Sequence, residues 1–179
     1  GILRRIYARL DLHRYSDTQK INFMDSLFIN SLLEDLKNPD EVVREEATRK
    51  LWRLWFQQKG VIGLEKIEAS QKLLDAGKIT EAEDMLTQLI ESEPDFAEAW
   101  NRRAFLYYTN NEYEKSLADT QVAIELNPLH FGALHGMGLC YAALGEYARA
   151  INSFQRALEI QPYSLINQKL VLECTLRIS

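Results

Sequence analysis

The sequence predicts an all-α protein, an α-solenoid of stacked helical hairpins, from three observations. Residues 97–130 and 131–164 align without a gap as two copies of one 34-residue unit. Pro94, Pro128 and Pro162 follow one another at this same interval. Apolar residues recur at the three- and four-residue spacing of a helix that buries one face. A repeat of this length is one helical hairpin, and hairpins stack because one alone cannot cover its apolar face.

The repeated unit resembles the tetratricopeptide repeat (TPR) family over residues 63–162. That family's pattern has a large residue, a small one four positions on, an aromatic three later, then Ala, Phe and a closing Pro. The matching positions are Trp100, Ala104, Tyr107, Ser116, Thr120, Ala123 and Pro128, then Leu134, Gly138, Tyr141, Ala150, Phe154, Ala157 and Pro162. The preceding unit is more degenerate, with Lys66 at the large position and Leu89 where Ala is usual.

Small residues in this pattern mark the crossing of the two helices in each hairpin. Ala104 and Gly138 should let the backbones approach, while Tyr141 and Phe154 fill the space between hairpins. We expect the stacked hairpins to curve around a concave groove. The resemblance implies that this groove binds a segment of another protein.

We expect two domains, residues 1–60 and 61–179. The second should contain repeats 63–96, 97–130 and 131–164, followed by a solvating capping helix at 165–178. The repeat helices are expected near 63–76, 79–92, 97–110, 113–126, 131–144 and 147–160. Gly77, Asn110 with Asn111, and Gly145 should supply the turns within the hairpins.

The N-terminal region predicts a short amphipathic helix at 2–15 and a helical hairpin at 18–36 and 40–59. Residues 32–54 resemble a single HEAT repeat. Both hairpin helices are apolar nearly all round, so we expect 40–59 to be sandwiched between 18–36 and the first repeat hairpin. The alternative is that the face with Trp52 and Trp55 stays exposed for a partner.

Composition disfavours several functional classes. The net charge is −5, and residues 61–179 carry ten basic and seventeen acidic side chains, a surface that repels nucleic acid. No apolar stretch of about 18 residues is present, which disfavours a membrane protein. Cys140 and Cys174 are read as small buried residues in a soluble protein of a reducing compartment, the cytoplasm or an organelle stroma. Because the chain begins with Gly1, the sequence leaves open whether a targeting segment precedes it.

No catalytic constellation stands out, so we predict a protein that is not an enzyme and has no cofactor or metal. Gly136-Met137-Gly138 lies inside a predicted helix and is not a phosphate loop. His135 and Cys140 are five residues apart and do not share a helical face for a metal. Carboxylates such as Asp95 and Glu98 follow the rhythm of an exposed face and are interpreted as solvated surface.

The resemblance also implies which residues line the groove, since these come mainly from the first helix of each hairpin. The candidate partner-binding residues are Gln71, Asn101, Arg102, Phe105, Tyr108, His135 and Leu139. Co-chaperones of the family hold the C-terminal tail of Hsp70 or Hsp90 with a carboxylate clamp of Lys, Asn and Arg. The corresponding residues here are Ile67, Gln71, Arg102, Gly132 and Gly136, so we expect no binding of that tail by such a clamp.

Gly132, Gly136 and two alanines should leave room in the groove for a bulky guest. Our hypothesis is that an apolar or aromatic segment, a helix or an extended peptide, lies against Phe105 and Tyr108 with a polar or acidic group on Arg102. In the alternative, Phe105 and Tyr108 pack on the neighbouring hairpin or on the C-terminal helix.

These features predict a scaffold or adaptor that binds another protein reversibly in complex assembly or regulation. The alternative is a self-associating structural protein, a homodimer formed through the Trp-rich hairpin or the capping helix.

Overall fold

The computed structural model describes residues 17–179, with side chains from residue 25 onward, and over this range it contains only helices. They are α2 (Asp17–Asp35), α3 (Glu41–Phe56), α4 (Gly60–Asp75), α5 (Ile79–Ser92), α6 (Ala97–Thr109), α7 (Tyr113–Leu126), α8 (Phe131–Ala143), α9 (Tyr147–Ile160) and α10 (Leu165–Ile178). The predicted all-α class is therefore confirmed, while the helix expected at 2–15 lies outside the described residues. None of the helices in the described range is both long and apolar enough to cross a membrane.

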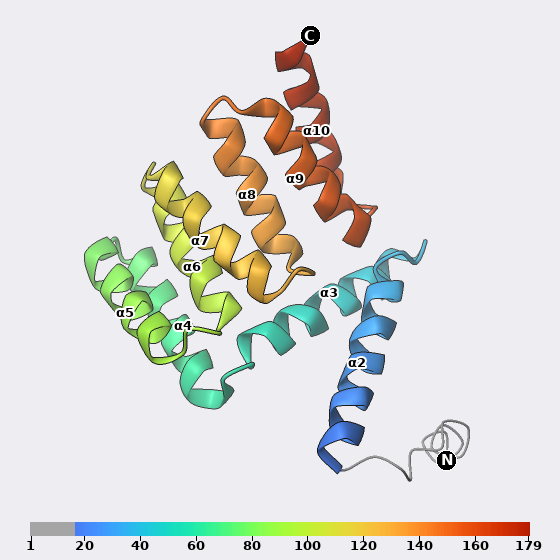
Figure 1. Cartoon of the computed structure of the whole chain (residues 1–179), viewed down its shortest axis with the longest axis vertical. Coiled ribbons are helices and arrows are strands. Elements are labelled where there is room, and N and C mark those ends of the chain that lie inside the picture. The colour runs from blue at the N-terminus through green and yellow to red at the C-terminus, as the bar shows by residue number, and fades with distance from the viewer. Residues whose placement is uncertain (1–16) are drawn as a thin grey trace.

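The pairs α4/α5, α6/α7 and α8/α9 form three antiparallel hairpins that stack in chain order, and α10 packs on α9 (Figure 1). Each hairpin turn is closed by the same backbone bond, donated to a carbonyl five residues earlier: Lys78 to Leu73, Glu112 to Tyr107 and Glu146 to Tyr141. The residue before each donor has a positive φ, at Gly77, Asn111 and Gly145. Gly and Asn tolerate this conformation, which is why the predicted turn positions are confirmed.

The tight helix crossings are also where the sequence places small residues. A Cβ added at Gly138 would lie 2.4 Å from Cε1 of Phe154, so only glycine fits beside that fully buried ring. Ala104 is 1% exposed, and the Ser116 hydroxyl donates to its carbonyl at 2.7 Å. These contacts fix the spacing of α6 with α7 and of α8 with α9.

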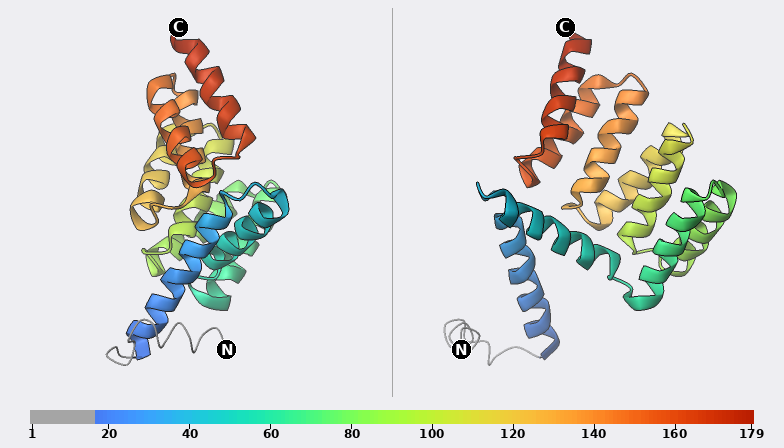
Figure 2. Two further views of the ribbon diagram at one scale, coloured as in Figure 1. Left: turned by 90° about the vertical axis from the view of Figure 1, so that its right-hand side faces the viewer. Right: turned by 180° about the vertical axis from the view of Figure 1, so that it is seen from behind.

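The position of α3 differs from the predicted sandwich. Its Ala47 and Leu51 do pack on α2, but Trp52 and Trp55 contact His130 and Phe131 at the start of α8. Figures 1 and 2 show α3 running along the ends of the repeat helices from α4 toward α10, with α2 projecting away from the array.

This packing buries the Trp-rich face of α3 in part and brings the N-terminal helix pair into contact with a repeat far along the chain. The predicted helix pair is present, whereas its likeness to a HEAT repeat and the division into two domains stay predictions.

The outer face of α10 is also unlike the solvating cap that was expected. Cys174 is buried against α9, and Leu170 and Val171 pack beside it. On the other side, Leu172 and Leu176 are 66% and 74% exposed. The helix covers the third repeat with one face and presents an apolar second face to solvent.

Both cysteines are buried, Cys140 at 0% and Cys174 at 4% exposure, as the sequence predicts. Burial raises the pKa of both thiols above the ordinary value, which lowers the thiolate fraction at pH 8. We expect iodoacetamide to leave both thiols of the native protein unlabelled over an hour at pH 8 and to label both in urea, as measured by mass spectrometry. The Cys140→Ala variant assigns the remaining signal to Cys174, and rapid native labelling would contradict the burial. The assignment to a reducing compartment stays a prediction.

Candidate functional site

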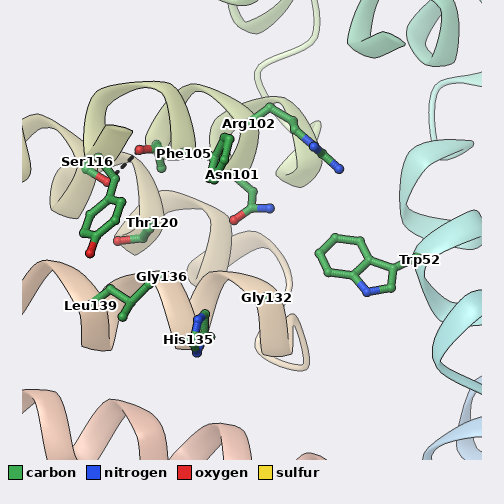
Figure 3. Close-up of a pocket in the computed structure, with 12 residues that line it drawn as sticks. Trp52, Asn101, Arg102, Phe105, Ser116, Thr120, Gly132, His135, Gly136 and Leu139 are labelled. Carbon is green, nitrogen blue, oxygen red and sulfur yellow. Dashed lines mark hydrogen bonds between the residues drawn. The ribbon is translucent and has the colours of Figure 1, made fainter. Parts of the chain in front are cut away.

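A cavity of about 300 Å³ opens between α6 and α8, with α3 at one end (Figure 3). We call it the groove pocket. The predicted partner-binding residues that line it are Asn101, Arg102, Phe105, Tyr108, His135 and Leu139. Gly132 and Gly136, also predicted to be in the groove, line it as well, together with Trp52, Ala104, Ser116 and Thr120. The size is at the lower end of the roughly 300–1,000 Å³ range of small-molecule sites, which suits one or two side chains.

The pocket wall on α6 includes two aromatic side chains, Phe105 and Tyr108. Phe105 is 47% exposed, so its ring is not covered by a neighbouring hairpin. The alternative prediction required such coverage. Tyr108 is half-buried and contacts the Tyr113 ring at a centroid distance of 5.6 Å. Burial raises the pKa of the Tyr108 hydroxyl, which therefore stays a neutral hydrogen-bond donor and acceptor near pH 7.

Below this wall lies a buried polar network that the sequence analysis missed. Glu98, interpreted from the sequence as solvated, is fully buried and lies 2.7 Å from Nε2 of His130. The amide of Ala133 donates to Nδ1 of His130 at 3.0 Å, so that nitrogen carries no hydrogen. Nε2 must therefore donate to the Glu98 carboxylate. The pair joins α6 to the start of α8 and fixes the relative position of the two pocket walls.

Arg102 belongs to the same network. Its Nε donates to Glu98 at 2.9 Å, its Nη1 donates to Gln71 at 3.2 Å, and its guanidinium lies 4.8 Å from the centre of the Phe56 ring. Gln71 does not line the pocket and instead holds Arg102 from α4. Because Glu98 already neutralises Arg102, a partner carboxylate would have to share this cation.

The α8 wall is open at one glycine and filled at the other. A Cβ at Gly136 would meet only the Thr120 methyl, at 3.6 Å, so the predicted room exists there. At Gly132 the prediction of free room is wrong, because a Cβ would lie 2.5 Å from Cη2 of Trp52. The indole of Trp52 occupies the space that this glycine leaves.

His135 is held by the C-terminal helix. Its Nδ1 lies 2.6 Å from the side-chain oxygen of Asn167, which is 3% exposed, and an amide oxygen can only accept. Nδ1 therefore donates, and the ring orientation of His135 depends on α10. Among the described residues, Arg102 is the only Lys or Arg that lines the pocket.

Of the pocket residues that the sequence analysis missed, Trp52 comes from farthest away. Ala104 and Ser116 were assigned to the helix crossing alone, and Thr120 was matched only to the repeat pattern. The available signal for Trp52 was an uncovered aromatic face on α3 together with a glycine at a groove position of α8. The aromatic face alone does not indicate that it packs on α8, and the glycine alone does not indicate that an indole fills its space.

Comparisons with known proteins agree with this architecture. Two family models described as tetratricopeptide repeat match residues 68–124 and 132–164, together about half of the chain. A TPR repeat-containing protein of Rhizobium etli is 28% identical over 135 residues, which is 75% of this chain and 66% of the relative. This chain therefore spans just under two thirds of that relative.

Solved structures show the same fold. The first TPR domain of human RPAP3 superposes with a TM-score of 0.62 at 23% identity, covering 64% of this chain and 91% of that domain. The TPR2B domain of yeast Sti1, solved in a complex with Hsp70, gives a TM-score of 0.57 at 20% identity and covers 63% of this chain and 98% of that domain. At such identity the likeness establishes the fold alone. The repeat register, the three stacked hairpins and the matched models together show that the chain belongs to the tetratricopeptide repeat family.

Proposed function

We propose that the chain is a non-catalytic scaffold or adaptor that binds a segment of another protein in the groove pocket. The observation that carries the proposal is the half-exposed aromatic wall of Phe105 and Tyr108 opposite Leu139, which offers an apolar guest a site between two repeats. Large aromatic residues in a concave site are frequent hot spots of protein binding. The Sti1 domain, with the same fold, is in complex with another protein.

The charges around the pocket narrow the chemistry of the guest. The carboxylate of Glu98 compensates Arg102, and Gly132 and Gly136 contribute no cation. The pocket therefore suits a neutral, bulky apolar or aromatic side chain on an extended peptide or a helix. Arg102 keeps guanidinium N–H groups that can donate to a carbonyl of the guest. Capture of the acidic Hsp70 or Hsp90 tail through a carboxylate clamp is not part of this proposal.

The test uses a 12-residue peptide selected from a random phage-displayed library against the whole chain. Phe105→Ala and Tyr108→Ala are each expected to weaken binding of this peptide about tenfold or more, because each removes contact area in the centre of the site. Fluorescence anisotropy measures the Kd, and circular dichroism checks helicity. Arg102→Glu is a poor probe because it would place a second carboxylate beside buried Glu98.

Leu126→Ala is the matched control, since Leu126 is 41% exposed on α7 and does not line the pocket. Its affinity for the peptide should stay within twofold of the parent chain. Equal affinity of the parent, Phe105→Ala and Tyr108→Ala would place the peptide elsewhere and refute the proposal.

Self-association is the second candidate function, and the exposed Leu172 and Leu176 of α10 favour it. Sedimentation velocity over a concentration series separates the two candidates. A monomer at all concentrations supports the adaptor, and a concentration-independent dimer supports the structural protein.

A further inference from the structure

Residues of α3, together with Gln58 and Lys59 just after its C-terminal end, contact each of the three connections that follow a repeat. At the first connection, Nζ of Lys59 pairs with the Asp95 carboxylate at 2.7 Å. Gln58 also donates to the Asp95 carbonyl, at 3.3 Å. At the second connection, Trp55 stacks on His130 with ring centroids 4.4 Å apart.

The third connection is contacted by the N-terminal half of α3. Gln161 donates to the Thr48 hydroxyl at 3.4 Å, and the Arg44 guanidinium lies 4.1 Å from the centre of the Tyr163 ring. The contacts made by Lys59, Trp55 and Thr48 are four and seven residues apart along the chain. This segment therefore reaches the three connections one after another.

From this position α3 reaches both walls of the groove pocket. Phe56 lies against Arg102 of α6, at 4.8 Å from the guanidinium. Trp52 occupies the space beside Gly132 of α8, and Figure 3 shows its indole projecting from α3 toward the α6 and α8 residues that line the pocket.

The orientation of the Trp52 indole is determined by its neighbours. Its ring lies edge-on to His130 at 5.2 Å and edge-on to Phe131 at 5.5 Å. His130 is in turn held by Glu98 at 2.7 Å. The indole is therefore placed by the same buried network that joins α6 and α8, and any side chain at position 132 would displace it.

We propose that Trp52 is a specificity-determining residue of the groove pocket, which it closes at the α3 end. A bulky apolar side chain of the partner segment packs against the indole, and the indole limits how large that side chain is. This inference rests on the proposed function of the pocket. It assigns part of the binding site to the helix pair that precedes the repeats.

The test compares affinities for one phage-selected 12-residue peptide in which the pocket-binding position is Leu, Phe or Trp. Trp52→Ala lengthens the pocket, so its preference should shift toward the Trp peptide by about tenfold relative to the Leu peptide. Gly132→Ala keeps the indole but displaces it, and it should also change the ratio of affinities. A purely structural role would weaken binding of all three peptides equally, leaving the ratio unchanged.

Arg44→Ala is the matched control, because it loosens α3 at the third connection without touching the pocket. This variant should keep the ratio of the parent chain. An unchanged ratio in both Trp52→Ala and Gly132→Ala would overturn the inference. Uniformly tighter binding by Trp52→Ala would overturn it as well, since α3 would then compete with the partner.

Failure of the inference is distinguishable from failure of the proposed function. Peptides that respond to Phe105→Ala but not to either Trp52 or Gly132 variant would refute only the role of Trp52. Peptides that respond to none of these variants would refute both.

Discussion

Glu98→Ala is expected to lower the free energy of unfolding by about 3 kcal/mol, because it removes the acceptor of buried His130 and of partly buried Arg102. Nε2 of the fully buried His130 loses the carboxylate at 2.7 Å, and Nε of Arg102 loses it at 2.9 Å. The side chain of Arg102 is 25% exposed, so water can satisfy part of its loss and the low end of the usual 3–5 kcal/mol applies.

Urea denaturation followed by circular dichroism measures this change. The free energy of unfolding of Glu98→Gln should lie between those of the parent chain and Glu98→Ala. Its amide oxygen can still accept from His130, while the charge opposite Arg102 is lost. Glu125→Ala, at an exposed carboxylate of α7, is the matched control and should change stability by less than about 0.5 kcal/mol. A loss below about 1 kcal/mol for Glu98→Ala would contradict the prediction that this network stabilises the fold.

Phe154→Ala is expected to cost about 3–5 kcal/mol of folding free energy, the usual cost of truncating a fully buried phenylalanine. Phe154 of α9 is 0% exposed and packs between α8 and α10, where Ala150 and Cys174 belong to the same core. Phe105→Ala, at a ring that is 47% exposed, is the matched control and should cost less than about 1 kcal/mol.

A double-mutant cycle with Gly138→Ala makes this prediction specific to the helix crossing. In the parent chain the new methyl would meet the Phe154 ring at 2.4–2.7 Å, so the substitution should cost about 1–3 kcal/mol. In the Phe154→Ala background the space is free, and alanine should stabilise the helix by about 0.5–1 kcal/mol relative to glycine. Additive effects of the two substitutions would contradict the contact between these residues.

Local patterns made most of the repeat array predictable. The three prolines in register and the left-handed turns at Gly77, Asn111 and Gly145 mark most ends of the repeat helices, so that α6 (Ala97–Thr109) differs by one residue from its prediction. These features act over a few residues only. The helix ends can therefore be inferred from the local sequence. By contrast, α4 begins at Gly60, three residues before its predicted start.

The groove residues were predictable in part for the same reason. Once the repeat register is known, the helical period decides which side chains of α6 and α8 share a face, and Phe105, Tyr108 and Leu139 do line one pocket. Whether that pocket binds a partner stays a prediction. The burial of Glu98 was not predictable, because its partner His130 lies 32 residues away, directly before α8.

The sequence alone determined the helices, their hairpins and the spacing of the repeats, since these depend on short-range steric and hydrogen-bonding preferences. Only the tertiary structure decided where the Trp-rich helix packs and which carboxylate is buried. An apolar face specifies that it must be covered but not by what, because the hydrophobic effect has no direction. Several apolar surfaces could have covered the face of α3 that carries Trp52. The fold of the whole chain determines that this residue packs against Gly132.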